Sequence, residues 1–273
     1  MRKVFLNICA VALLFTSCGG MTKLAKCSDY DYKYEAAKAY YADGMYGSAA
    51  TLLEESIAIM KGTDKAEESL YLLAMCNMKM GDYDSAAKFF TTYYNSYPKG
   101  KYTALARFNC GKALYSDTPN PRLDQTSTIK AISELQNFID YFPESHLKDR
   151  AEKMQFELQD KLVEKDFLAA KLYFDLGGYF GNCTSGGNNY QACIITAQNA
   201  LKDYPYSEYR EDLYYLILKS KYNLAAQSVE SKQDERYRDA IDEYYGFKNE
   251  FPESKYTKEV DKIFKESSKR VKN

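Results

Sequence analysis

Two stretches of the chain align with each other residue for residue, and they decide the fold. The first, AKAYYADGMYGSAATLLEES, covers residues 37–56, and the second, AMCNMKMGDYDSAAKFFTTY, covers residues 74–93. In each, a glycine follows a helical pattern and an alanine lies a few residues beyond it, as Gly44 and Ala49 do in the first. Glycine ends a helix through a left-handed turn, and a small alanine lets two antiparallel helices approach closely. The two stretches therefore predict two consecutive helix pairs.

A proline motif separates further helix pairs. Proline disfavours helix in the preceding residue and cannot continue a helical hydrogen-bond ladder, whereas serine and glycine are suitable N-caps. We therefore predict that each copy ends one helix and starts the next, with the serine or glycine as the N-cap. The motif reads aromatic, Pro, any residue, Ser or Gly, any residue, Tyr or Leu, and it occurs at residues 97–102, 142–147, 204–209 and 251–256.

Helix pairs that recur in this way are typical of the tetratricopeptide repeat, a unit of helical solenoids. The predicted fold class is all-α, a tetratricopeptide-like α-solenoid of about five helix pairs plus a C-terminal capping helix. Repeats 1–3 are expected in residues 31–145, repeats 4–5 in residues 146–254, and the capping helix in residues 255–273. Looser copies close on Ala131, Leu135, Phe138 and Pro143, on Cys193, Ala197, Ala200 and Pro205, and on Ala240, Tyr244, Phe247 and Pro252.

The N-terminal segment has the form of an export signal. Arg2 and Lys3 precede an apolar run of about a dozen residues, which is too short for a membrane-spanning helix of about 20. The sequence LFTSC at residues 14–18 resembles a bacterial lipobox, in which the cysteine is lipidated and becomes the new N-terminus. We expect residues 1–17 to be removed and residues 18–30 to form a tether. A plain signal peptide with an incidental cysteine is the alternative.

Lipidation of Cys18 would also determine where the protein resides. Several acyl chains, palmitate among them, hold a protein stably on a bilayer, whereas a single chain binds only marginally. Gly19 follows the cysteine, with no aspartate there and no acidic cluster just after it, so signals for inner-membrane retention and surface export are missing. We therefore expect a lipid-anchored protein on the periplasmic face of the outer membrane.

Composition argues against several classes of function. Lys and Arg number 37 against 38 Asp and Glu, so the chain has no basic surplus for nucleic acid. The mean hydropathy of −0.54 predicts no membrane span after the signal. The single histidine, His146, cannot supply a metal cluster, and no nucleotide-binding or hydrolase motif is present. We therefore expect no enzyme activity, metal or cofactor.

Four of the later cysteines fall into two groups. Cys76 and Cys110 lie within apolar helical patterns and are expected in the core. Cys183 and Cys193 flank a glycine-rich loop, and an exported protein can form disulfides. The sequence leaves both a disulfide and two free thiols open for this second pair.

A lipidated N-terminus, five tetratricopeptide-like repeats and the aromatic-proline junctions together resemble the BamD family, the outer-membrane lipoproteins of the β-barrel assembly machinery. The resemblance covers nearly the whole chain after the signal, and it implies a scaffold that catalyses no reaction. It implies that the C-terminal repeats dock the periplasmic domains of the barrel-inserting subunit, alongside other assembly lipoproteins. The N-terminal repeats would receive the C-terminal targeting strands of nascent outer-membrane proteins.

The first helix of each pair lines the concave groove in tetratricopeptide arrays, which indicates where a targeting strand would bind. Two lysines amid aromatics and methionines would suit a terminal carboxylate beside an apolar side chain. The alternative is that several of these side chains are simply buried between helices. The groove candidates are Tyr34, Lys38, Tyr41, Tyr71, Met75, Met78, Phe108, Lys112 and Tyr115.

Contacts with the barrel-inserting subunit map onto no motif in this sequence. We therefore offer only the region of residues 209–221, with Tyr209, Arg210, Tyr214 and Lys221, and the terminal helix. A generic periplasmic tetratricopeptide adaptor for cell-envelope or cell-wall coordination is the main alternative function. A glycan-capturing lipoprotein is less favoured, because sugar-binding platforms commonly use Trp and this chain has none.

Overall fold

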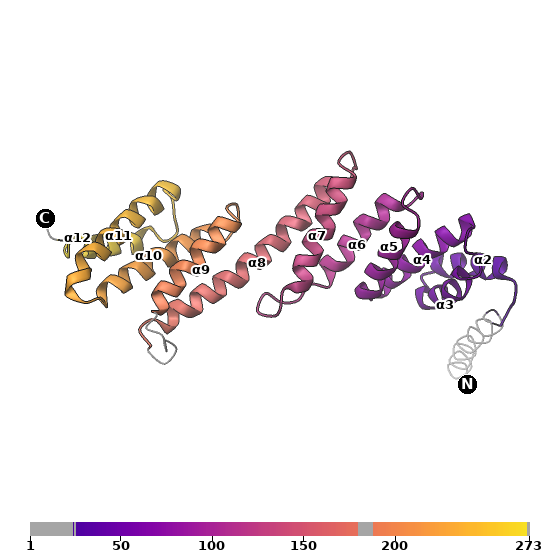
Figure 1. The fold of residues 1–273 in the computed structure, drawn as a ribbon, viewed down its shortest axis with the longest axis horizontal. Helices are drawn as coiled ribbons and strands as arrows, with labels where there is room; N and C mark the ends of the chain where they lie inside the picture. The colour runs from indigo at the N-terminus through magenta and orange to yellow at the C-terminus, as the bar shows by residue number, and fades with distance from the viewer. Residues whose placement is uncertain (1–23, 25, 180–187, 272–273) are drawn as a thin grey trace, which may run out of the picture. The chain divides into compact units, whose positions relative to one another are not determined.

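The computed structural model describes residues 24, 26–179 and 188–271, and this part of the chain is built from helices joined by short turns (Figure 1). It holds eleven helices, so the prediction of five helix pairs followed by a capping helix is confirmed. The helices are α2 (Tyr30–Ala42), α3 (Tyr46–Ile57), α4 (Asp64–Met80), α5 (Tyr83–Ser96), α6 (Thr103–Ser116), α7 (Thr126–Tyr141), α8 (Lys148–Leu176), α9 (Asn189–Asp203), α10 (Arg210–Ala226), α11 (Glu230–Glu250) and α12 (Thr257–Ser268).

The helices belong to two compact units. Unit 1 consists of Met1–Thr118 and Thr126–Gln155, and unit 2 consists of Pro119–Gln125 and Phe156–Asn273. Helix α8 therefore begins in unit 1 and ends in unit 2. The domain boundaries expected from the sequence stay a prediction. The expected signal peptide and the lipidation site Cys18 lie outside the described residues.

One small residue in each repeat explains how closely the paired helices pack. It lies on the second helix of the pair and is at most 1% exposed in every repeat. A side chain of this size lets the facing helix approach closely. In the first two repeats, the turn before this helix contains a glycine in the left-handed conformation: Gly44 has φ +77° and Gly81 has φ +80°. The five residues at this position are Ala49, Ala86, Ala131, Cys193 and Ala240.

The proline junctions end and start helices where the sequence predicted. After α9, for example, the Ser207 N–H donates to the Tyr204 carbonyl at 3.3 Å, and the Arg210 N–H donates to the Ser207 carbonyl at 3.2 Å. These two successive turns reverse the chain within six residues. Helices α6, α8, α10 and α12 each begin at the residue directly after the motif.

The prediction that the serine or glycine of each junction is the N-cap of the following helix was wrong. The N-cap of α10 is Tyr209, which forms no side-chain cap hydrogen bond. The hydroxyl of Ser207, which lies three residues before the first residue of the helix, instead accepts the Tyr209 N–H at 3.2 Å. Ser145 and Ser254 do the same for the residue two positions on, at 3.3 Å and 2.9 Å. The serine therefore closes a local turn, because the second turn of the junction separates it from the helix.

A carboxylate on an earlier helix completes several junctions. Glu67 Oε1 of α4 accepts the Lys101 N–H at 2.8 Å and the Tyr93 hydroxyl at 2.5 Å. Asp160 of α8 accepts the Ser207 hydroxyl at 2.6 Å, and Asp212 of α10 accepts the Tyr256 hydroxyl. Each of these acceptors satisfies polar groups at a turn that would otherwise leave them unpaired.

We expect Glu67→Ala to lower the free energy of unfolding by about 1–3 kcal/mol, because the Tyr93 hydroxyl is then left without its carboxylate acceptor. Glu67→Gln should cost less, since the amide oxygen can still accept. Urea denaturation followed by far-UV circular dichroism would measure both. Glu54→Ala, an exposed glutamate of α3, is the control. An effect of Glu67→Ala no larger than that of this control would contradict the assigned role.

Each unit has its own apolar core. In unit 1, Phe138 of α7 is fully buried and meets the Phe108 ring edge-on with centroids 5.4 Å apart. In unit 2, Val163 of α8 packs with Ile194 of α9 and Leu213 of α10. Burying apolar area of this kind supplies most of the stabilisation of a helical array.

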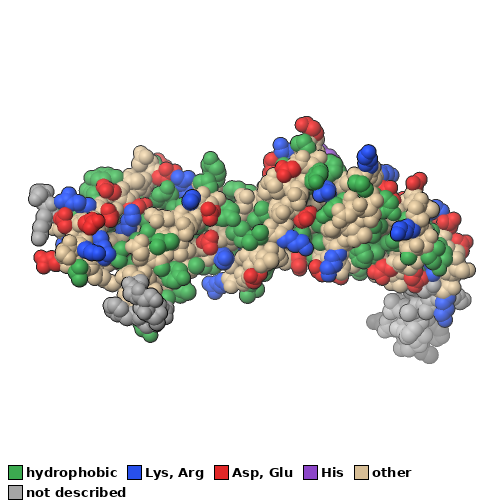
Figure 2. Space-filling view, in the orientation of Figure 1, with side chains coloured by type: hydrophobic (Ala, Val, Ile, Leu, Met, Phe, Trp, Pro, Cys, Tyr) green, Lys and Arg blue, Asp and Glu red, His purple; other side chains and the backbone are tan. Residues whose placement is uncertain are grey.

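The capping helix packs an apolar face against the last helix pair. On α12, Val260 is fully buried, and the Phe264 ring stacks on Tyr244 of α11 with centroids 4.5 Å apart. Figure 2 shows acidic and basic side chains interspersed over the visible face, as the net charge of −1 suggests. No helix in the described part of the chain is long and apolar enough to cross a membrane.

Candidate functional site

Helices α4 and α6 bring several of the predicted groove residues of unit 1 together. Tyr71 of α4 stacks on Tyr102, with ring centroids 4.6 Å apart and an interplanar angle of 13°. Asn109 of α6 donates through Nδ2 to the Tyr71 hydroxyl at 3.2 Å, and the same nitrogen lies 3.7 Å from the Met75 Sδ atom. Burial raises the pKa of Tyr71 to about 12, so the phenol stays neutral. This surface therefore combines aromatic, thioether and amide groups in fixed positions.

Lys79 lies four residues after Met75 on α4, and Lys112 lies three residues after Asn109 on α6, so each is one helical turn from these groups. Arg150, in the first turn of α8, is a third cation, and its charge acts on Lys112. Burial, followed by the charges of Arg150 and Lys79, lowers the pKa of Lys112 below its usual range. The Arg150 guanidinium carbon lies 5.7 Å from the centroid of the Phe108 ring. Within the described part of the chain, none of the three forms an ion pair. We call these residues the basic cluster. It is suited to an anion.

Two of the groove candidates belong to the core, which was the alternative left open by the sequence. Tyr34 and Phe108 are each 3% exposed. The Tyr34 hydroxyl donates to Glu68 Oε2 at 2.6 Å, and burial, followed by Glu68, raises the pKa of Tyr34 well above its usual value. Phe108 packs edge-on against Phe138. Neither side chain offers much surface to a ligand.

The remaining groove candidates are half-buried, so part of each side chain reaches the surface. Tyr41 packs edge-on against Tyr46, with ring centroids 5.4 Å apart. Lys38 lies 4.9 Å from the Tyr34 ring centroid and 3.8 Å from Glu35, so it has an acidic neighbour. The residues of this group are Lys38, Tyr41, Tyr71, Met75, Met78, Lys112 and Tyr115. Their role in binding stays a prediction.

Sequence reasoning missed Lys79, Asn109 and Arg150. Lys79 follows the candidate Met78 directly, and Asn109 follows Phe108, so neither has a signal of its own in the repeat pattern. Arg150 lies three residues after the FPESHL junction, at the start of the next first helix. The groove spacing that gives Phe108, ten residues after Pro98, gives Lys153 after Pro143, so it would not have found Arg150.

The family of the chain follows from a comparison with known proteins. Residues 28–182 match the model of the YfiO family, described as outer membrane lipoprotein, which is more than half of the 273-residue chain. The chain belongs to the YfiO family. Two crystal structures of nearly identical TPR-like repeats from a Podosopora anserina kinesin light chain are also similar, each at 13% identity and a TM-score of 0.33. Each match covers 82% of this chain. It covers 96% of the first kinesin light chain structure and 97% of the second. No curated protein sequence matches it.

The matched YfiO region contains all the groove candidates and the basic cluster. The docking candidates lie beyond it, and their basic members are engaged within unit 2. Arg210 Nη2 lies 2.8 Å from Glu250 Oε1, and Lys221 Nζ lies 2.6 Å from Glu243 Oε2. Both contacts join α10 to α11. A contact of these two residues with a partner would have to compete with these ion pairs.

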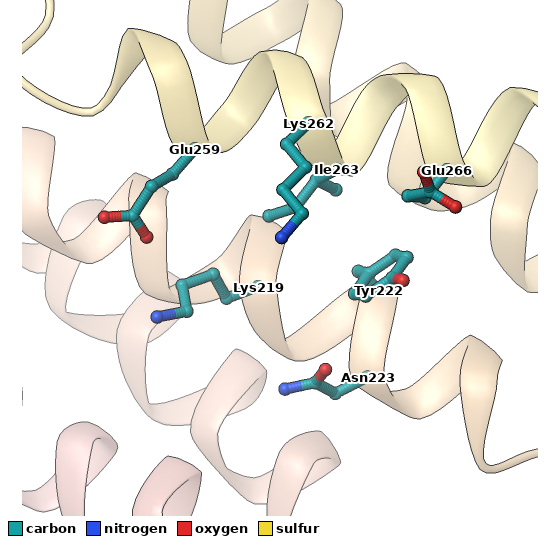
Figure 3. A pocket seen from close by; sticks show the side chains of 7 residues that line it. All are labelled: Lys219, Tyr222, Asn223, Glu259, Lys262, Ile263 and Glu266. Carbon is teal, nitrogen blue, oxygen red and sulfur yellow. The ribbon is translucent and has the colours of Figure 1, made fainter.

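The aromatic docking candidates are likewise packed against neighbouring helices. Tyr209 lies against Phe167 of α8, with ring centroids 5.5 Å apart, and Tyr214 meets Phe251 edge-on at 5.6 Å. Their role in docking stays a prediction. The terminal helix, the other region offered for docking, lines a pocket with α10 (Figure 3).

The cysteines of this YfiO family member show core packing. Cys76 and Cys110 are buried, as predicted, and burial raises their pKa to about 12 and about 11. Cys193 is buried at the small-residue position of its repeat. Cys183 lies outside the described residues, so the suggested pair stays a prediction. The described residues contain no group of three or more His, Cys, Asp or Glu side chains that could hold a metal ion.

Proposed function

We propose that this YfiO family lipoprotein is a non-enzymatic scaffold of outer-membrane β-barrel assembly, of the BamD type. It is lipidated at Cys18 and held on the periplasmic face of the outer membrane. It binds the barrel-inserting subunit together with other assembly lipoproteins, and unit 1 receives the targeting strands of nascent outer-membrane proteins.

The basic cluster is the observation that carries this proposal. Lys112 has two cationic neighbours and no carboxylate partner among the described residues, so its charge is repelled in the free protein. A ligand carboxylate would relieve that repulsion, and charge-assisted hydrogen bonds to a carboxylate are strong. Asn109, one helical turn before Lys112 on α6, contacts Tyr71 and Met75, and Tyr71 stacks on Tyr102, so these groups can receive an apolar or aromatic side chain. A chain end that carries both groups fits this surface.

The experiment is a mild-detergent pull-down from outer membranes with a C-terminally tagged chain. We expect it to recover a large barrel protein with periplasmic domains. Cys18→Ala should lose outer-membrane fractionation, because the chain would then lack its acyl anchor. Cys27→Ala, a second cysteine nearby in the chain, is the matched control and should fractionate unchanged. Recovery of cell-wall enzymes alone would overturn the assembly role and leave a generic periplasmic adaptor.

A further inference from the structure

A second surface with convergent polar groups lies in unit 2, beyond the residues matched by the YfiO family. It is a pocket of about 370 Å³ between α10 and α12 (Figure 3). This volume is in the range of sites that take a small ligand or a few side chains. Its lining residues are Lys219, Tyr222 and Asn223 of α10, and Glu259, Lys262, Ile263 and Glu266 of α12.

Three polar side chains at this pocket form no ion pair or hydrogen bond with another described residue. Neither Lys219 nor Lys262 forms an ion pair with any described residue, and the side-chain amide of Asn223 makes no hydrogen bond there. The Lys219 Nζ atom lies 4.9 Å from the ring centroids of both Phe174 and Tyr215, which hold the ammonium in place. The pocket thus presents the Lys219 ammonium, which is held against two rings, the Lys262 ammonium and the side-chain amide of Asn223.

The two carboxylates of the pocket are already engaged. Glu259 accepts the hydroxyl of the buried Tyr215, and Glu266 Oε1 lies 2.8 Å from Lys269 Nζ. Lys269, followed by Arg270 and by Lys262 itself, lowers the pKa of Glu266, so this group is ionised and paired. The pocket lining thus carries two lysines and two glutamates, and Lys262 lies between Glu259 and Glu266 on α12, so positive charge is at the centre and negative charge on both sides (Figure 3).

We propose that this pocket binds an acidic side chain within a segment of a partner protein. The aspartate or glutamate lies between Lys219 and Lys262, and an adjoining apolar side chain packs on Tyr222 and Ile263. Asn223 hydrogen-bonds the backbone of the segment, since an amide can both donate to and accept from a peptide group. The pocket shares no residue with the groove of unit 1, but Lys219 lies within residues 209–221 and α12 is the terminal helix, the two regions offered above for docking. This inference therefore deepens the docking part of the proposed function and rests on it. The peptide experiment below tests the pocket alone, whereas the pull-down tests the assembly role.

The positions of Glu259 and Glu266 favour an internal segment over a chain end. They lie on either side of Lys262, two turns of α12 apart, which is about 10 Å along the helix axis. A segment that continues in both directions from its acidic residue can place a donor or a basic side chain near each carboxylate. A terminal carboxylate leaves one of them unmatched. The preferred ligand is therefore acidic at its centre and basic on both sides.

The test uses the full mature chain in detergent and a fluorescein-labelled peptide, acetyl-Ser-Lys-Leu-Glu-Leu-Lys-Ser-amide, followed by fluorescence anisotropy. We expect the peptide with Gln in place of Glu to bind at least about tenfold more weakly, as for the loss of a hydrogen bond to a charged group. Lys262→Gln, at an exposed side chain, should weaken binding of the Glu peptide by a similar factor. Lys219→Gln should do the same, although it also removes the contacts with Phe174 and Tyr215.

The matched control is the double variant Lys258→Gln/Lys265→Gln, which removes two exposed positive charges from α12 outside the pocket. It should bind the Glu peptide as the unchanged chain does. Three results would overturn the proposal: equal binding of the Glu and Gln peptides, equal losses in the control and the pocket variants, or tight binding only of a peptide whose free C-terminus replaces the Glu. The last result would assign the pocket to a chain end instead.

Discussion

Replacing Lys112 with glutamate is expected to weaken the binding of a peptide with a free C-terminal phenylalanine by roughly thirtyfold or more. Lys112 is the half-buried member of the basic cluster, and the other two members, Lys79 and Arg150, are exposed. Truncating one partner of a buried, hydrogen-bonded charge pair costs about 2 kcal/mol or more, and each 1.4 kcal/mol is a factor of about ten in affinity. Isothermal titration calorimetry of the full mature chain with the peptide would measure the change.

The variant should remain folded, because a glutamate at this position would face two cations where Lys112 now faces repulsion. Lys99→Glu, at an exposed residue of the first proline junction, controls for the change in net charge and should bind normally. Amidating the peptide C-terminus should reproduce most of the loss in the unchanged chain. If amidated and free peptides bound equally well, the basic cluster would not be a carboxylate site.

The pH dependence supplies a second readout of the same site. Binding needs the charged form of Lys112, and this form is lost as the pH rises through its pKa. Burial and the neighbouring cations hold that pKa below the ordinary lysine value of 10.5. Affinity for the peptide should therefore be full at neutral pH and should fall at a lower pH than the titration of an exposed lysine would cause. A profile that follows ordinary lysines would contradict the role of Lys112.

Phe138→Ala is expected to lower the free energy of unfolding by about 3–5 kcal/mol, the usual cost of truncating a buried phenylalanine. Phe138 is fully buried and contacts the rings of Phe108 and Phe142, with centroids 5.4 Å and 5.8 Å away. Removing it would leave a cavity between α6 and α7 and would remove two aromatic contacts. Urea denaturation followed by far-UV circular dichroism would show the loss as a lower midpoint.

Ile129→Ala, on the same helix, is the matched control because Ile129 is 59% exposed. Its effect should stay within about 0.5 kcal/mol, as for most surface substitutions. Comparable losses for the two variants would mean that α7 does not form the core of unit 1 through Phe138. If only Phe138→Ala lowered the free energy of unfolding, the result would agree with a core of unit 1 that includes Phe138.

Much of the architecture was predictable because its signals are local. Gly44 and Gly81 need only their own backbone conformation to end a helix, and both have the left-handed φ that the repeat predicts. Prolines 98, 143, 205 and 252 each prevent helix locally. The structure therefore has the predicted succession of helix pairs. The N-cap error has the same origin, because a serine near a helix start can also close a preceding turn, as Ser207 does.

The candidate sites were only partly predictable. The spacing from Gly81 selects Tyr71 and Met75 of α4, and the structure shows that Asn109 contacts both. The same rule also selected Tyr34 and Phe108, which are buried. A residue at a groove position is exposed or buried according to how each helix is rotated against its neighbours, and that rotation depends on the packing of every side chain in between.

The sequence by itself thus determined the helix pairs, their boundaries and the small residues at which they cross, since glycine, proline and alanine act through the local chain. Only the tertiary structure decided which charges meet. Lys79, Lys112 and Arg150 come from three different helices, and Lys219 and Lys262 come from two. No spacing along the chain specifies that these groups converge without carboxylate partners. Convergence of this kind arises from the packing of whole helices, because charges interact according to their distance in space.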